Sequence, residues 1–220
     1  MLKGIIFDFD YTLTDRSYAL YLGAQNIVNT HLKDLDPMEQ ESIIQRIMTL
    51  DEFGTIDKDH IIKNLVKNYP FDYDKLKADF AKLSYYMAPF TKLDKEAIPL
   101  LKYLKENTDY KLAILTNGNT ETQMMKINQV GITAYFDYIA VAEESGYWKP
   151  DPRAFTYIAN KLGLNPEECL YIGDCFYNDI IGAYRANMQY LLLNNNRKHT
   201  YGNFVPVIDH LNDLLKYLEI

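Results

Sequence analysis

The sequence predicts an α/β fold in which a core with a parallel β-sheet is interrupted by an inserted bundle of helices. Two observations lead to this prediction. Short apolar runs rich in β-formers alternate with helical patterns through most of the chain, which is typical of a parallel sheet covered by helices on both faces. One long interval near the amino terminus breaks this rhythm, because it has helical periodicity and few strand-like runs.

The strand-like runs are short and apolar, and most are followed by turn residues. Strands are predicted at residues 2–7, 112–115, 138–141, 169–172 and 190–193. Runs of this kind are typical of strands that are buried on both faces of a sheet. The carboxyl-terminal segment predicts a last edge strand over 204–208 and a closing helix over 209–218 that has Asp209 near its start.

The interval that interrupts the sheet is predicted to form a helical domain over residues 16–93. Its amphipathic helices are predicted at residues 17–31, 37–50, 58–68 and 73–86. Breaks at Asp36-Pro37, Phe53-Gly54 and Tyr69-Pro70 separate them. Because four helices of this length can close a bundle of their own, the core comprises residues 1–15 and 94–220, and a helix over 93–106 leads back to it.

The composition narrows the classes of function. Apolar residues make up 48% and charged residues 24% of the 220 residues, as in an ordinary soluble globular protein. The net charge of −7 argues against nucleic acid or an anionic membrane as the main partner, because either would need a basic face. Two cysteines, Cys169 and Cys175, cannot build a disulfide framework, and no apolar segment is long enough to span a bilayer. We therefore expect a cytoplasmic protein with reduced thiols.

The strongest functional signal is a pair of aspartates, Asp8 and Asp10, directly after the first predicted strand. Two carboxylates that lie close together raise each other's pKa unless a cation intervenes, and a hard divalent cation with oxygen ligands meets that need. By itself an Asp-x-Asp pair more often ends a strand and begins a turn. Its interpretation therefore depends on the other strand ends.

Polar residues also follow the later strands. Leu115-Thr116-Asn117-Gly118 presents a hydroxyl and backbone N–H groups just before a helix, as anion-binding turns do. In Lys149-Pro150-Asp151-Pro152, the lysine would supply the positive charge that an anionic ligand requires. Gly173-Asp174 brings a third carboxylate to the same edge of the sheet, and Asn178 and Asp179 follow about one helical turn later.

Each of these motifs is common in isolation, as a turn, an exposed loop lysine or a helix cap, but their joint occurrence in this order is a strong signal. It resembles the haloacid dehalogenase superfamily of aspartate-nucleophile phosphohydrolases. The helical insertion after the first motif looks like the C1-type cap of subfamily I, the group that includes phosphoglycolate phosphatases, nucleotidases and β-phosphoglucomutases. The resemblance implies a Rossmann-like core and a phosphatase that acts on phosphoric monoesters.

The resemblance also implies roles for the first aspartates and for the phosphate-binding residues. Asp8 would be the nucleophile that forms an aspartyl-phosphate, and Asp10 would be the general acid and base. Thr116 and the backbone N–H of Asn117 would bind the phosphoryl oxygens. Lys149 would neutralise charge between Asp8 and the phosphate.

The cofactor implied by the resemblance is Mg²⁺. Its ligands would be the Asp8 carboxylate, the Asp10 backbone carbonyl and Asp174. Asn178 and Asp179 would orient a ligand water or the lysine. No role is assigned to the histidines, which are His31, His60, His199 and His210.

The expected substrate is a small phosphorylated metabolite, either a nucleoside monophosphate, phosphoglycolate or a sugar phosphate. Asp10 favours phosphate esters, because halide-removing members of the superfamily need no acid for a departing alkoxide. A phosphosugar mutase and a non-catalytic phosphate- or partner-binding module remain open as alternatives. The aromatic residues of the insertion are expected to lie in its core rather than to stack on a base, and a monomer and a homodimer are both compatible with the sequence.

Overall fold

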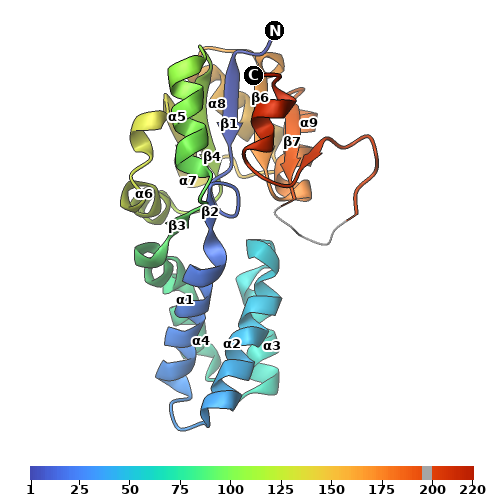
Figure 1. Cartoon of the computed structure of the whole chain (residues 1–220). Helices are drawn as coiled ribbons and strands as arrows, with labels where there is room; N and C mark the ends of the chain where they lie inside the picture. Colours follow the sequence, from blue (N-terminus) through green and yellow to red (C-terminus); the bar gives the residue numbers. More distant parts are fainter. Residues whose placement is uncertain (195–199) are drawn as a thin grey trace. The chain divides into compact units, whose positions relative to one another are not determined.

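The computed structural model describes residues 1–194 and 200–220, which leaves His199 outside the described residues. The chain divides into two compact units (Figure 1). The sheet unit comprises Met1–Asp15 and Leu93–Ile220, and the helical unit comprises Arg16–Lys92.

The sheet unit is built on six parallel strands in the order β5-β4-β1-β6-β7-β8. The strands are β1 Gly4–Phe7, β4 Lys111–Thr116, β5 Tyr138–Val141, β6 Cys169–Gly173, β7 Gln189–Leu193 and β8 Val207–Ile208. Strand β1 is central, and its Phe7 lies opposite Ile114 of β4 and Ile172 of β6. The residues that follow β1, β4 and β6 therefore emerge side by side. The predicted α/β fold with a parallel sheet is confirmed.

Helices cover both faces of this sheet, as a parallel sheet requires. They are α5 Ala97–Asn107, α6 Thr120–Gln129, α7 Ala142–Ser145, α8 Pro152–Lys161, α9 Ile181–Arg185 and α10 Asp213–Tyr217. Successive residues of a strand point to opposite faces, so Ile5 packs in the apolar cluster that contains Leu101 of α5, and Ile6 packs in the one that contains Phe155 of α8. Figure 1 shows α5 and α8 on opposite sides of the strands.

The helical unit is a bundle with an apolar core of its own. Its helices are α1 Arg16–His31, α2 Pro37–Asp51, α3 Lys58–Asn68 and α4 Tyr73–Met87. Their ends lie within one residue of the predicted ends. The starts of α2, α3 and α4 are marked by caps, because Asp36, Asp57 and Asp72 each accept a backbone N–H from the first turn of the helix that follows.

The aromatic residues of the helical unit divide into two groups. Tyr21 and Tyr73 are partly buried against the apolar core, as expected. Tyr18, Phe53 and Tyr85 are exposed, so for them the expected core position is wrong. The periodicity of an amphipathic helix does not separate these cases, since a tyrosine at the edge of the apolar face can turn its ring outward and keep its hydroxyl in water.

Three predicted boundaries in the sheet unit are wrong. The helix expected from residue 93 begins at Ala97, because Lys92–Leu93 instead forms β3, which pairs with β2 Thr14–Asp15. The closing helix begins at Asp213 and not at Asp209. The edge strand is also shorter than predicted: it starts at Val207, because the residue before it is a proline, which has no N–H to donate to a strand ladder.

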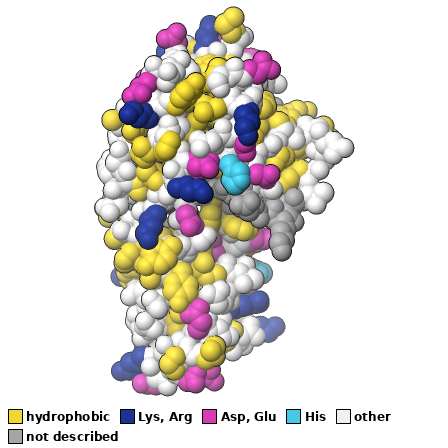
Figure 2. Space-filling view, in the orientation of Figure 1, with side chains coloured by type: hydrophobic (Ala, Val, Ile, Leu, Met, Phe, Trp, Pro, Cys, Tyr) yellow, Lys and Arg dark blue, Asp and Glu magenta, His cyan; other side chains and the backbone are white. Residues whose placement is uncertain are grey.

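Charged side chains of both signs lie among apolar ones on the face of the molecule shown in Figure 2. None of the helices in the described parts of the chain is long and apolar enough to cross a membrane.

Candidate active site

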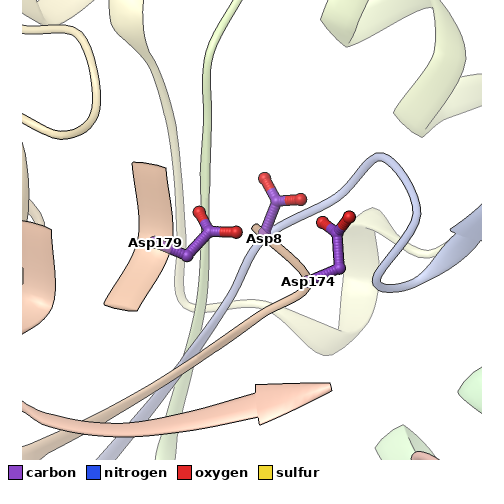
Figure 3. Close-up of side chains that lie close together, drawn as sticks. All are labelled: Asp8, Asp174 and Asp179. Atoms are coloured by element: carbon purple, nitrogen blue, oxygen red, sulfur yellow. The ribbon is translucent and has the colours of Figure 1, made fainter. Parts of the chain in front are cut away.

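Three carboxylates meet at the carboxyl edge of the sheet (Figure 3). Asp8 follows β1, Asp174 follows β6, and Asp179 lies in the π-helical turn η5, Phe176–Ile180. One oxygen from each carboxylate lies within 4.8 Å of the others, and all three side chains are buried. The parallel pairing of β1 with β6 brings these residues together, although they are far apart in the sequence.

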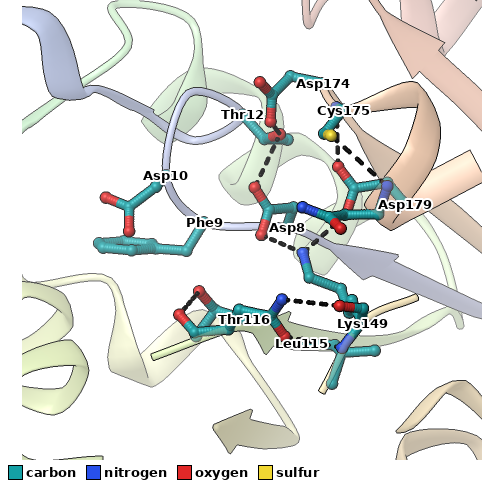
Figure 4. Close-up of polar contacts among 12 residues, drawn as sticks. Asp8, Phe9, Asp10, Thr12, Leu115, Thr116, Lys149, Asp174, Cys175 and Asp179 are labelled. Carbon is teal, nitrogen blue, oxygen red and sulfur yellow. Dashed lines mark hydrogen bonds and ion pairs between the residues drawn. The ribbon is translucent and has the colours of Figure 1, made fainter. Parts of the chain in front are cut away.

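Lys149 is inserted between two of these carboxylates. Its Nζ lies 2.6 Å from Oδ1 of Asp8 and 2.7 Å from Oδ1 of Asp179 (Figure 4). The side chain of Asn117 holds the lysine in place through its backbone: Asn117 Oδ1 accepts the Lys149 N–H at 2.8 Å, and Asn117 Nδ2 donates to the Lys149 carbonyl at 3.0 Å. The loop after β4 thus fixes where this ammonium group lies.

Asp179 is held in turn by several donors. Its Oδ1 accepts hydrogen bonds from Lys149 and from the Tyr171 hydroxyl at 3.1 Å, and its Oδ2 accepts the Cys175 N–H at 2.9 Å. Both oxygens of Asp179 are therefore engaged with the protein. This arrangement makes Asp179 a fixed partner of the lysine.

Thr12 lies at the other side of the Asp8 carboxylate. Its hydroxyl is 3.4 Å from Asp8 Oδ2 and 3.3 Å from Asp174 Oδ1. One hydroxyl has one hydrogen and can serve only one of these oxygens at a time. Because Lys149 engages Asp8 Oδ1, the oxygens of Asp8 and Asp174 that face Thr12 form a hard, anionic donor pair of the kind that a divalent cation binds.

In the described part of the chain, the carboxylates of this cluster outnumber the ammonium groups that contact them. Burial raises the pKa of Asp8 well above its usual value; Lys149 opposes that rise, and Asp179 and Asp174 add to it. Burial alone would lower the pKa of Lys149, but Asp179 and Asp8 outweigh it, so the pKa of the ammonium is well above its usual value. Among the described residues, Lys149 is the ammonium that contacts this group of three buried carboxylates, and a divalent cation would favour their ionised forms.

The loop between β4 and α6 contains the predicted anion-binding turn. Thr116 is buried at the end of β4, and its Oγ1 accepts a hydrogen bond of 2.6 Å from Gln123 Nε2. Gly118 has a φ of +138°, a region that favours glycine, and a Cβ at this position would crowd Gln123. The side chain of Asn119 caps α6 by accepting the Thr122 N–H.

Asp10 does not join the cluster of carboxylates. Its side chain is directed away from Asp8 in Figure 4, and both of its oxygens lie within hydrogen-bond distance of Lys126 Nζ, at 2.7 and 2.6 Å. The expectation that the two carboxylates of the Asp-x-Asp pair lie together is therefore wrong. Lys126 on α6 offers Asp10 a counter-charge of its own, so the pair does not need to share one.

The structure brings Asp8, Lys149, Asp174 and Asp179 into one cluster, with Asn117 behind the lysine. Asn178 contributes its backbone N–H to Cys175 Sγ, and it is Asp179 that reaches Lys149. Sequence reasoning missed four residues that contact the predicted ones: Thr12, Tyr171, Gln123 and Lys126. The sequence does contain one signal for Gln123 and Lys126. They lie three residues apart and therefore share a face of the helix with the apolar Ile127.

Comparison with known proteins identifies the family to which this chain is similar. The family model described as haloacid dehalogenase-like hydrolase matches residues 5–193. The chain is 30% identical over 193 residues to a glyceraldehyde 3-phosphate phosphatase of Methanopyrus kandleri, a match that covers 86% of this chain and 82% of that protein.

Solved structures agree in fold. The HAD-hydrolase YfnB of Bacillus subtilis, solved bound to magnesium, matches with a TM-score of 0.78 and 24% identity over 100% of this chain and 99% of that one. A 2-haloacid dehalogenase of Pseudomonas syringae matches with a TM-score of 0.67 and 23% identity over 100% and 99% of the two chains. The match over most of the sequence, together with this shared fold, shows that the chain belongs to the haloacid dehalogenase-like hydrolases.

Proposed function

We propose that this protein is a Mg²⁺-dependent phosphatase that hydrolyses small phosphate monoesters through an aspartyl-phosphate on Asp8. The observation that carries the proposal is the lysine between Asp8 and Asp179 in a buried cluster of three carboxylates. A phosphoryl group in transfer carries charge on its equatorial oxygens, and its transfer is promoted mainly by positioning and by nearby positive charge. The phosphatases among the relatives support the same class of reaction.

In the first step, an oxygen of Asp8 attacks phosphorus. The new bond from Asp8 to phosphorus forms while the bond from phosphorus to the ester oxygen breaks, and Asp10 gives a proton to that departing oxygen, so that an alcohol leaves. In the second step, a water attacks the aspartyl-phosphate and gives a proton to Asp10. Inorganic phosphate leaves, and the Asp8 carboxylate is restored.

The remaining residues stabilise charge. Lys149, the Thr116 hydroxyl and the backbone N–H of Asn117 bind phosphoryl oxygens, and Asp179 keeps Lys149 in position. The Asp8 carboxylate, Asp174 and the backbone carbonyl of Asp10 would hold Mg²⁺, which when bound neutralises negative charge on the carboxylates and the phosphoryl group.

The helical unit is proposed to be the cap that the sequence predicts over residues 16–93, the part of the chain that selects among esters. The substrate class is a small phosphorylated metabolite, and glyceraldehyde 3-phosphate, which the relatives' name suggests, is placed first. Asp10 supports a phosphate ester as substrate, because an acid is needed when an alkoxide leaves.

Phosphate release from a panel of esters tests the proposal. The panel comprises glyceraldehyde 3-phosphate, phosphoglycolate, sugar phosphates, nucleoside monophosphates and 4-nitrophenyl phosphate, each with Mg²⁺ and with EDTA. We expect release with Mg²⁺, a loss of at least about a hundredfold with EDTA, and recovery when Mg²⁺ is restored. Turnover that is unchanged by EDTA would contradict the metal requirement, and the absence of release from every ester would contradict the phosphatase.

Gly173→Ala is expected to lower both stability and activity by displacing Asp179. A Cβ at Gly173 would overlap the Asp179 side chain, so Asp179 must shift from the position in which it contacts Lys149. We expect a loss of about 1–3 kcal/mol in unfolding free energy and a fall in kcat of at least about tenfold. Denaturant unfolding and phosphate release measure the two effects.

Gly4→Ala is the matched control, because a Cβ there would overlap the end of the Leu164 side chain at the start of β1 and not a side chain of the site. We expect a similar loss of stability with kcat per folded molecule retained. Equal losses of kcat in the two variants would show that Asp179 has no special role in holding Lys149.

A further inference from the structure

Helix α6 places a lysine and a glutamine against the predicted general acid. Lys126 Nζ lies 2.7 and 2.6 Å from the two oxygens of Asp10, and Gln123 Nε2 lies 3.1 Å from Asp10 Oδ2. The exposed fraction of the side chain is only 6% for Lys126 and 24% for Asp10. Two side chains on one face of α6 thus donate hydrogen bonds to the Asp10 carboxylate.

Lys126 is buried, unlike most lysines, which lie at the surface of a protein. Most lysines keep the ammonium group in water, and a buried ammonium is unfavourable unless it is paired and hydrogen-bonded. Here the ammonium is paired with Asp10 and lies 5.5 Å from the centre of the Phe9 ring. Phe9 is fully buried next to Asp10, so the backbone at Asp10 is anchored while Lys126 fixes the direction of its side chain.

Gln123 connects this pair to the phosphate-binding turn. The same Nε2 that donates to Asp10 lies 2.6 Å from Thr116 Oγ1. Because the Thr116 hydroxyl accepts this hydrogen bond, its own hydrogen is available to a carbonyl or to a phosphoryl oxygen. The residue that would bind phosphate and the residue that would protonate the ester oxygen are therefore held by one amide group.

We propose that Lys126 and Gln123 are positioning residues that hold the Asp10 carboxylate in the place from which it transfers a proton to the departing ester oxygen. This inference rests on the proposed phosphatase function. Neither residue needs to touch the reacting atoms, since both act through Asp10. Their contribution should therefore scale with how much the departing group needs a proton.

Lys126→Met tests this with two esters. The 4-nitrophenolate of 4-nitrophenyl phosphate leaves without a proton, whereas the alkoxide of glycerol 3-phosphate requires one. The parameter is kcat/KM, because it reports the steps up to the departure of the alcohol. We expect Lys126→Met to lower kcat/KM for glycerol 3-phosphate by a factor at least about ten times larger than the factor for 4-nitrophenyl phosphate. The loss for glycerol 3-phosphate should appear as a lower kcat, with KM unchanged.

Three variants complete the test. Lys126→Arg is expected to recover most of the lost activity, because it keeps a charged donor at the same place. Adding Lys126→Met to Asp10→Asn is expected to cause no further loss, since the lysine acts through Asp10. Gln129→Met, at an exposed position of α6, is the control for the helix itself.

The outcomes separate the two proposals. If the unaltered protein hydrolyses neither these two esters nor any ester of the panel, the phosphatase proposal fails; if it hydrolyses another alkyl ester of the panel, that ester takes the place of glycerol 3-phosphate. If it hydrolyses both, but Lys126→Met lowers kcat/KM for both by the same factor or for neither, or worsens Asp10→Asn, the positioning role is refuted. Should Lys126→Met fail to fold, as judged by circular dichroism, Gln123→Leu takes its place with the same expected dependence on the ester.

Discussion

Asp8→Asn is expected to abolish phosphate release and at the same time to make the metal-free protein more stable. The loss of turnover should reach about four to six orders of magnitude, because the change removes the proposed nucleophile, through which the rest of the proposed site acts. The gain in stability follows from the surroundings of Asp8, which is buried beside Asp174 and Asp179. Asp8→Asn removes this like charge and leaves Lys149 paired with Asp179, so we expect a gain of about 1.4 kcal/mol for each unit by which folding raises the pKa of Asp8.

The gain should depend on pH, with a sign that the pKa shift determines. Burial and the neighbouring carboxylates raise the pKa of Asp8 in the folded protein, with Lys149 opposing them. Between the unfolded pKa of about 3.9 and the raised folded value, the folded state binds more protons, so its stability falls as pH rises. The difference in unfolding free energy between Asp8→Asn and the unaltered protein should therefore grow from about pH 4 upward.

Denaturant unfolding in EDTA across this range of pH measures the effect, and Asp109→Asn, at an exposed carboxylate, serves as the control. Mg²⁺ should narrow the difference, because it stabilises the unaltered protein more than the variant. A variant that is less stable than the unaltered protein at every pH would contradict the charge imbalance described for the cluster.

Lys149→Met is expected to have the same effect on turnover and the opposite effect on stability. Turnover should fall by at least about a thousandfold, because the phosphoryl group would then approach three carboxylates without this counter-charge. Removing one partner of a buried ion pair costs about 3–5 kcal/mol, since the remaining charges stay buried. The lysine is 4% exposed and contacts both Asp8 and Asp179, so this cost should apply in full.

Thermal unfolding with EDTA and with Mg²⁺ provides the measurement. We expect Mg²⁺ to raise the Tm of Lys149→Met by more than that of the unaltered protein, because the variant has one cation fewer in the cluster. Lys161→Met, which removes a lysine that lies over the rings of Tyr138 and Tyr157, should leave kcat unchanged. If Lys149→Met unfolds at the same Tm as the unaltered protein in EDTA, the lysine does not hold the cluster together.

The elements of the fold were predictable where the sequence pattern is local. Helices α2, α3 and α4 have aspartate caps directly before them, and each buried strand is a continuous apolar run. Strands β2 and β3 were missed because each is two residues long and exists only through its pairing with the other. No local pattern carries that information.

The residues of the candidate site likewise include some that the sequence predicted and some that it did not. Asp8, Lys149 and Asp174 follow strands whose parallel order brings them to one edge, so their order in the sequence was informative. The spacing of Gln123 and Lys126 indicates a shared helix face, but the pairing of Lys126 with Asp10 was not predictable, because packing decides where that face of α6 lies. Tyr171 was hidden for another reason: within β6 it reads as one more residue of an apolar run, and only its hydroxyl, which reaches Lys149, shows its part in the site.

The central position of β1 has a consequence for how the protein is made. Phe7 of β1 pairs with Ile114 and Ile172, so both neighbours of β1 are synthesised much later than β1 itself. The helical unit has its own apolar core from one continuous segment and is complete before either neighbour exists. Contacts between residues distant in sequence form slowly, and unpaired strand edges promote aggregation. Strand β1 therefore stays without its two neighbours through much of translation, and an incomplete chain that ends before β6 lacks Asp174 and Asp179 of the carboxylate cluster.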